Sequence, residues 1–275
     1  MGLRINTNIS SLAAQRQLSV VSNRLSSNFQ RLSSGLRIAN ASDDPAGLGI
    51  SERMRAQLSS IAQASRNSQD GVSLVQTAEG ALSESNANLI RMRELAIAAA
   101  NGTLNAGDRK TLNAEFTALS AEVDHLANST KFNGVNLLNN ANGSIDIQTG
   151  SEKGDVISLS LADMTLVGLG LTGSSFDITT VTNATNLLST LDTAIDTLTT
   201  TRGSLGASQN RLQTAIRSLG NAEENLSASE SRIRDVDVAH ETADLTRNTI
   251  LQQAAVSVLS QANLQPQIAL SLLQG

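Results

Sequence analysis

Cysteine, tryptophan and tyrosine are absent from this 275-residue chain, which also contains only two prolines and four phenylalanines. The absence of cysteine excludes disulfides, thiolate nucleophiles and cysteine-bound metals. Sandwiches and barrels usually need more aromatic residues and more turn breakers, so the composition favours long, uninterrupted helices. Nucleic-acid-binding folds that stack bases on aromatic side chains lose their platforms, and a net charge of −5 offers no basic surface for phosphates.

Long apolar runs are also missing. No stretch of about 18 consecutive apolar residues occurs, so we expect no membrane-spanning helix. The first 30 residues contain neither the apolar segment nor the cleavage site of a secretory signal peptide. We therefore expect the chain either to be cytoplasmic or to leave the cell by a route that needs no cleaved signal.

What the chain does contain is a regular spacing of aliphatic residues. From Leu188 to Ile233 they recur at alternating steps of three and four, which predicts one long helix with a coiled-coil seam. Four positions of this seam are polar: Arg202, Gln209, Glu223 and Glu230. The same register over 54–89 and over 112–126 predicts two further helices. A stripe of this kind needs helical partners, so we expect a mainly α fold, a long coiled-coil-like helical bundle.

Local signals place the ends of these helices. Asp44 followed by Pro45 is an N-cap with proline at the first helical position, although Gly47 makes a full capping box impossible. Asn101-Gly102 predicts a left-handed C-cap for this helix, and the next helix is expected to end near Asn128.

Both ends of the chain carry thin apolar stripes on a background rich in Ser, Asn and Gln. The residues expected to matter there are Ile5, Ile9, Leu12, Leu251, Val258, Leu272 and Leu273. Pro266 is expected to interrupt the last helix. Such termini suggest pairing with each other or with neighbouring subunits; the alternative is that they are ordinary helices of one bundle.

Only residues 141–180 look non-helical, and their alternation predicts a small β-hairpin region. Gly168, Gly170 and Gly173 match the spacing of a dinucleotide-binding loop, but the extended segment that follows favours a mobile turn, and we expect no cofactor. His125 and His240 fit solvated surface positions better than a metal site. No group of residues indicates an enzyme.

Arginines lie in short charged groups on two predicted helices, one around Arg91 and Arg93 and the other around Arg232 and Arg234. Two interpretations stay open: a solvated helix face, or a fixed contact between subunits, which the rigid arginine fork favours.

Several longer motifs resemble one known family. Segments such as INTNISSL at 5–12, RLSSGLRIANASDDPAG at 31–47, QASRNSQDGVSLVQTAEGAL at 63–82 and FNGVNLL at 132–138 resemble the amino-terminal region of bacterial flagellins. The segment 231–273 is similar to their carboxyl-terminal region. Residues 141–181 carry no family signature. Because so few residues separate the two regions, the chain resembles minimal flagellins that lack the outer variable domains.

This resemblance implies two core domains, each built from both chain ends. Residues 1–42 and 234–275 would form an inner-core coiled-coil domain that is disordered in the monomer, and residues 43–233 an outer-core helical bundle with the hairpin at about 141–180. The implied function is that of a secreted structural subunit that self-assembles into the extracellular flagellar filament used for motility. The alternative is the hook–filament junction protein.

The resemblance also implies partners. These are further copies of the chain, the flagellar type III export apparatus and its chaperone, the filament cap, and the junction proteins. Arg91, Leu95 and Glu115 match positions by which the vertebrate Toll-like receptor recognises the family, although Ala98 departs from the Gln that receptor-binding members often carry. The same three residues would also lie on a surface that neighbouring subunits cover.

Overall fold

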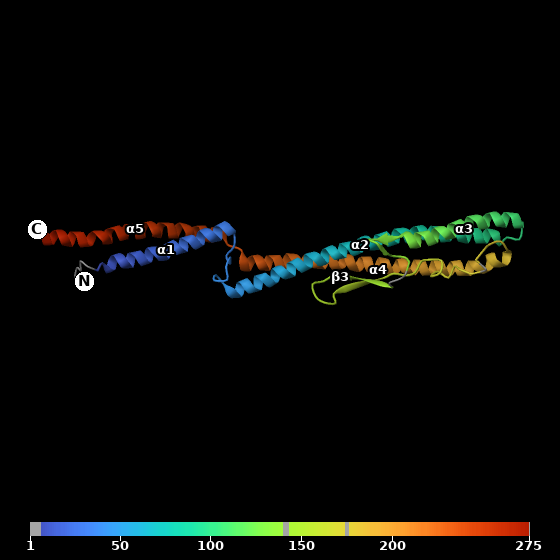
Figure 1. Cartoon of the computed structure of the whole chain (residues 1–275), viewed down its shortest axis with the longest axis horizontal. Coiled ribbons are helices and arrows are strands. Elements are labelled where there is room, and N and C mark those ends of the chain that lie inside the picture. Colours follow the sequence, from blue (N-terminus) through green and yellow to red (C-terminus); the bar gives the residue numbers. More distant parts are fainter. Residues whose placement is uncertain (1–6, 140–142, 174–175, 275) are drawn as a thin grey trace. The chain divides into compact units, whose positions relative to one another are not determined.

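The structure, a computed structural model, describes residues 7–139, 143–173 and 176–274, with only the backbone described for 266–274. The fold is mainly α, as predicted (Figure 1). The elements are α1 (Ile9–Ser34), α2 (Pro45–Ala99), α3 (Ala106–Ser129), β1 (Lys131–Phe132), β2 (Val135–Asn136), β3 (Ser144–Gln148), β4 (Val156–Ser160), α4 (Val181–Arg234) and α5 (Val238–Gln274). They divide into two compact units, one of residues 1–56 with 225–275 and one of residues 57–224.

Helix α2 begins where the sequence predicts. The Asp44 carboxylate accepts hydrogen bonds from the amides of Ala46 and Gly47, at 3.1 and 3.0 Å, which satisfies two otherwise unpaired donors of the first turn. An added Cβ at Gly47 would lie 2.7 Å from the Cδ1 of Ile38 and still closer to the Asp44 carboxylate, so a larger residue there would displace the capping side chain.

Helix α2 ends next to the predicted Asn101-Gly102 pair, but its cap differs from the prediction. Gly102 does not adopt a left-handed conformation, and the helix ends at Ala99. Instead, the guanidinium of Arg109 donates to the carbonyl oxygens of Ala99 and Asn101, each at 2.8 Å. A long-range arginine therefore satisfies the terminal carbonyls that a glycine cap would otherwise satisfy.

Helix α3 folds back beside α2. It starts with a capping box, in which Asn105 accepts from the amide of Asp108 and the Asp108 carboxylate accepts from the amide of Asn105. It ends at Ser129, one residue beyond the expected end. β1 and β2 follow as a short antiparallel pair joined by Asn133 and Gly134, which have positive φ values of 47° and 82°.

The predicted hairpin is present but shorter than expected. β3 and β4 pair antiparallel over 144–160, and residues 161–173 and 176–180 form turns and loops. The inward-facing Ile157 and Leu159 are buried, opposite Ile147 and Ile145. Past Ser160 the amide of Leu161 still donates to the Gly143 carbonyl at 3.0 Å, but the amide of Met164 donates to the Leu138 carbonyl at 2.8 Å, so the chain leaves the two-stranded ladder.

The core of the second unit lies between α2, α3, α4 and the β3–β4 hairpin. Its fully buried side chains include Leu82, Leu89, Met92, Phe116, Val123, Leu159, Leu191, Leu198, Leu205 and Leu212. Each large side chain of this kind stabilises the fold by about 1.5–3 kcal/mol before entropy is counted. The predicted α4 seam is fully helical, but it is buried only as far as Leu212; Ile216, Leu219, Leu226 and Ile233 are half-buried.

In the first unit, α1 and α5 run antiparallel side by side (Figure 1). Helix α5 continues through Pro266 to Gln274, so the predicted interruption is wrong. Proline removes one backbone donor, and a long helix that continues on both sides of that position can tolerate the loss of a single bond. Among the described residues, no helix combines the length and apolar character needed to cross a membrane.

Candidate assembly and recognition surfaces

The α1/α5 pair has a small apolar core. Among its described side chains, the buried hydrophobic ones are Ala14, Val21 and Ala262. The other aliphatic residues predicted to matter and described with side chains lie outside: Ile9 is 61% exposed, Leu12 52%, Leu251 42% and Val258 59%. The pairing of the chain ends therefore leaves many of their large apolar side chains exposed.

Three of the predicted terminal residues are less fully described. Leu272 and Leu273 lie near the end of α5, where only the backbone is described. Ile5 lies outside the described residues. The exposed apolar surface of the pair extends to neighbours that the prediction did not single out, among them Val20, Phe29, Val238, Ile250 and Val256.

A buried polar triad holds α1 against α5. The side-chain amide of Asn28 donates to the Glu241 carboxylate, and the Asn248 amide donates to the Asn28 oxygen at 2.8 Å. All three residues are less than 10% exposed. Buried polar groups tolerate only the register that satisfies them, so the triad selects one alignment of the two helices. Sequence reasoning missed it because Asn and Glu in a polar background carry no distinctive spacing.

The far end of the pair is tied in the same way. The Asn8 side chain donates to the carbonyl of Ala262 at 2.8 Å, and the Ser11 hydroxyl donates to the Asn263 side chain at 2.7 Å. These bonds fit the same antiparallel register as the triad. Residues near the start of α1 face residues in the later part of α5, and Asn28, near the end of α1, faces residues near the start of α5.

The two connecting segments of this unit are also joined. Leu36 and Asp235 form an isolated antiparallel bridge, with the amide of Val236 donating to the carbonyl of Gly35 at 3.0 Å. Arg234 contacts Glu52 at 2.7 Å and lowers the pKa of that carboxyl below its ordinary value. The backbone amides of Asn40 and Ala39, in that order, lower the pKa of the Asp43 carboxylate.

Arg91 and Glu115, predicted to share a surface, do lie together. The Arg91 guanidinium contacts the Glu115 carboxylate at 2.9 Å and the Glu94 carboxylate at 2.9 Å, and the side chains are about half exposed. Hydrogen bonds from Glu94 first, and then Glu115, raise the pKa of Arg91. Helices α2 and α3 bring these residues together because α3 folds back after the short connection at 100–105.

Leu95 is not on that surface. It is 3% exposed and belongs to the core between the helices. Four residues overshoot one helical turn of about 3.6 residues, so Leu95 is rotated from Arg91 toward the buried stripe that contains Met92 and Ala96. Ala98, by contrast, is exposed.

The other arginines form ion pairs within the chain. Arg93 contacts Asp192 of α4 at 2.6 Å, which raises the pKa of Arg93, and Arg202 contacts Glu79 at 3.5 Å. The Nε of Arg202 is buried without a hydrogen-bond partner among the described residues. The predicted arginine groups therefore include contacts between helices of one chain, beyond the two interpretations that the sequence left open.

The remaining predicted groups lie apart from these surfaces. The side chains of His125 and His240 are 70% and 77% exposed, as expected for solvated positions. The glycines at 168–173 lie in turns, and the next helix begins only at Val181. The described residues hold no group of three or more metal-ligating side chains.

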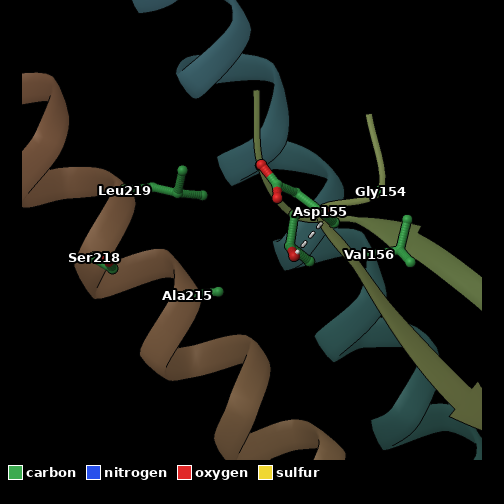
Figure 2. Close-up of a pocket in the computed structure, with 8 residues that line it drawn as sticks. Gly154, Asp155, Val156, Ala215, Ser218 and Leu219 are labelled. Carbon is green, nitrogen blue, oxygen red and sulfur yellow. Dashed lines mark hydrogen bonds between the residues drawn. The ribbon is translucent and has the colours of Figure 1, made fainter. Parts of the chain in front are cut away.

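A shallow hollow of about 420 Å³ lies between the tip of the β3–β4 hairpin and α4 (Figure 2). Its lining includes Asp155, Val156, Ala215, Ser218 and Leu219. The polar groups at the tip already bond to one another: the amide of Thr149 donates to the Asp155 carbonyl at 2.8 Å, and the Asp155 carboxylate accepts from the amide of Glu152. These bonds satisfy the polar groups at the hairpin tip within the chain.

Comparison with known proteins gives consistent matches. The model for the bacterial flagellin N-terminal helical region matches residues 5–143, and that for the C-terminal helical region matches residues 188–273. A flagellin of Halalkalibacterium halodurans is 45% identical over 270 residues, covering 98% of this chain and 99% of the relative. A flagellin of Bacillus subtilis is 40% identical over 304 residues, covering 99% and 100%. The crystal structure of Bacillus cereus flagellin matches with a TM-score of 0.51 at 34% identity, covering 56% of this chain and 88% of that one.

Proposed function

Because this chain belongs to the bacterial flagellin family, we propose that its α1/α5 pair carries the surface by which neighbouring subunits hold one another in a filament. The chain itself is a structural subunit that self-assembles into the extracellular flagellar filament used for motility. The relatives compared above are named flagellins, and nothing in the comparison favours the hook–filament junction protein.

One observation carries this proposal: the pair exposes far more large apolar side chains than it buries. Exposed apolar patches of this kind usually mark interaction surfaces, because covering them removes apolar area from water. In a homopolymer the occupant is a second copy of the chain, which presents the same stripe. The triad of Asn28, Glu241 and Asn248 supports the proposal, since it would hold the stripe of α1 and that of α5 in one fixed alignment.

The domain assignment is part of the proposal. Residues 1–42 with 234–275 form the inner-core coiled coil, and residues 43–233 form the outer-core bundle. The inner-core segments are disordered in the free monomer and fold on assembly. The small buried core of the α1/α5 pair supports this, because so little apolar burial in one chain does not offset the entropy of ordering two helices.

Other partners follow from family membership. The export chaperone binds the carboxyl-terminal helix, and the cap and junction proteins meet the subunit at the ends of the filament. The vertebrate flagellin-sensing Toll-like receptor contacts Arg91 and Glu115, while Leu95 supports them from the core. The role is structural, without catalysis, as membership in a structural family suggests.

Seeded polymerisation tests the assembly surface. Purified chain carrying Leu251→Ser and Val258→Ser is added to filament seeds, beside a control carrying Gln253→Ser and Gln261→Ser at exposed polar positions of the same helix. We expect elongation of the apolar variant to slow by roughly a hundredfold, since two apolar contacts worth about 1.4 kcal/mol each are lost on assembly, and the control to elongate like the parent. Equal elongation of both variants would show that this face is not the assembly surface.

A further inference from the structure

The sequence contains asparagine followed by glycine at 101–102, 133–134 and 142–143. In such a pair the glycine amide nitrogen can attack the asparagine side chain, because glycine has no side chain to obstruct the approach. Asn142 lies outside the described residues. The structure places the other two pairs in different surroundings, so their reactivities must differ.

Asn133 is held in an unreactive geometry. Its φ of 47° and the φ of 82° at Gly134 belong to the tight turn between β1 and β2. A left-handed residue has ψ near about +47°, which turns the next backbone nitrogen to the side of the Cα–C bond away from Cβ. Attack on the side-chain carbon requires that nitrogen to eclipse Cβ, so the hairpin must open before Asn133 can react.

Asn101 does not share that left-handed conformation. It lies exposed in the α2–α3 connection and is not among the described non-glycine residues with positive φ, of which Asn133 is the single case. The amide of Asn101 donates to the Ala98 carbonyl at 3.1 Å. The amide of Gly102, which is the nucleophile, makes no hydrogen bond to any described residue.

The groups around Asn101 polarise both reacting amides. The amide of Thr103 donates to the Asn101 side-chain oxygen at 3.1 Å and so stabilises negative charge on that oxygen during attack. The Arg109 guanidinium donates at 2.8 Å to the main-chain oxygen of Asn101, which belongs to the same peptide group as the Gly102 nitrogen. A cation on this oxygen favours the deprotonated, nucleophilic form of that peptide nitrogen.

We propose that Asn101 is a site of spontaneous, structure-assisted deamidation, with water as co-reactant. The Gly102 nitrogen gives its proton to solvent base and bonds to the side-chain carbon of Asn101. The bond from that carbon to the side-chain nitrogen breaks, and the nitrogen takes a proton and leaves as ammonia. Water then opens the resulting succinimide at either carbonyl, leaving aspartate or isoaspartate, with no change of oxidation state.

The product alters the connection between the helices. Either product adds a carboxylate near Arg109 and Asp108 in the α2–α3 connection. Isoaspartate also lengthens the backbone by one carbon, which moves the main-chain carbonyl of residue 101 away from the guanidinium that now satisfies it. The modification therefore weakens the capping of α2. The fraction of subunits modified at Asn101 also increases with the age of the protein.

Peptide mapping of the full chain measures the reaction. Samples are aged in mildly alkaline ¹⁸O-labelled water, natively and in urea, and then digested with trypsin; cleavage after Arg93 and Arg109 isolates residues 94–109 with Asn101. Isotope uptake and isoaspartyl methylation report conversion, and fragment-ion sequencing assigns it to single residues, because Asn133 and Asn142 share the tryptic peptide 132–153. We expect native Asn101 to convert at least about tenfold faster than native Asn133, and the two rates to converge in urea, where Asn101 slows.

Arg109→Gln tests the assistance, with Lys110→Gln as the control one residue away on an exposed side chain. The first variant should slow conversion at Asn101 several-fold and leave Asn133 unchanged, and the second should change neither rate. Circular dichroism verifies that both variants are folded. The proposal is wrong if native Asn101 converts no faster than native Asn133, if urea leaves its rate unchanged or raises it, or if a folded Arg109→Gln variant converts at the parent rate.

Discussion

At the scale of single residues, Arg91 has two roles that can be measured separately. Within the chain it forms exposed ion pairs with Glu94 and Glu115, which are worth at most about 1 kcal/mol. On a receptor, a buried arginine anchor is typically worth about 2 kcal/mol or more. We expect Arg91→Ala to lower the potency of dissociated monomer in a Toll-like-receptor reporter assay by roughly tenfold or more, with little change in the free energy of unfolding.

Polymerisation of the same variant is the necessary second measurement. If Arg91→Ala keeps its full potency but fails to polymerise, the surface serves assembly alone and the receptor hypothesis is wrong. Lys110→Ala is a suitable control, since it removes an exposed positive charge from the neighbouring helix α3.

Asp177 is expected to make the stability of the fold depend on pH in the acidic range. The hydroxyl and then the amide of Thr179, followed by the side chain of Asn183, lower the pKa of Asp177 below its ordinary value. A depressed pKa stabilises the fold above the unfolded-state value of about 3.9, and this contribution is lost as pH falls through the folded-state pKa. Asp177→Asn should therefore destabilise the chain near neutral pH, and the difference from the parent should vanish in acid.

Urea unfolding over a series of pH values measures this difference. Asp146→Asn, which removes an exposed carboxylate from β3, controls for the loss of charge alone. A gap between parent and Asp177→Asn that stays constant down to about pH 2.5 would contradict the linkage.

At the scale of elements, the triad in the α1/α5 pair can be tested directly. Asn28→Ala leaves the buried Glu241 carboxylate and the Asn248 side chain without their partner, which costs about 1–3 kcal/mol. In assembled filaments we expect the amides of α1 to exchange hydrogen faster, by the factor that this loss of free energy corresponds to. The control is Asn23→Ala, an exposed asparagine of the same helix; equal exchange in both variants would assign the triad no role in pairing.

For the polar seam of α4 we expect a substitution to raise stability, whereas the triad substitution lowers it. Gln209 is half-buried at a seam position, where a polar side chain specifies register at a cost in stability. Gln209→Leu should raise the urea midpoint and permit altered filament shapes. Glu223→Leu, at an exposed seam position, should leave the midpoint unchanged. Lower stability of Gln209→Leu with an unchanged swimming form would count against a register role.

Helix positions show how much local signals can predict. Asp44 and Pro45 place the start of α2 correctly because an N-cap acts within one turn. The position of the end of α2 was predicted correctly, but its left-handed cap was predicted wrongly, because the capping side chain, Arg109, belongs to the next helix. The capping box at Asn105 was also missed, since Asn and Asp replace the Ser or Thr and Glu or Gln of the usual signature.

At the scale of the whole molecule, the prediction concerns the chain ends. If the α1/α5 pair is stable only when neighbours cover its apolar side, far-UV circular dichroism should show helix content rising on polymerisation. Deletion of residues 255–275 should leave a folded bundle that cannot polymerise. The same helix content in monomer and filament would contradict the idea, and the deletion variant serves as the reference for a bundle without paired ends.

The sequence by itself determined the helices, the family and most of the candidate surfaces. Apolar periodicity and N-caps depend on neighbours within a few residues, and long motifs identify a family without any structure. Tertiary structure alone decided which residues meet. It buried Leu95 while leaving Arg91 and Glu115 exposed, ended the buried part of the α4 seam at Leu212, and joined Asn28 to Glu241 across the chain. These outcomes depend on the length over which each helix packs against its neighbours. The spacing of apolar residues along a single helix does not contain that information.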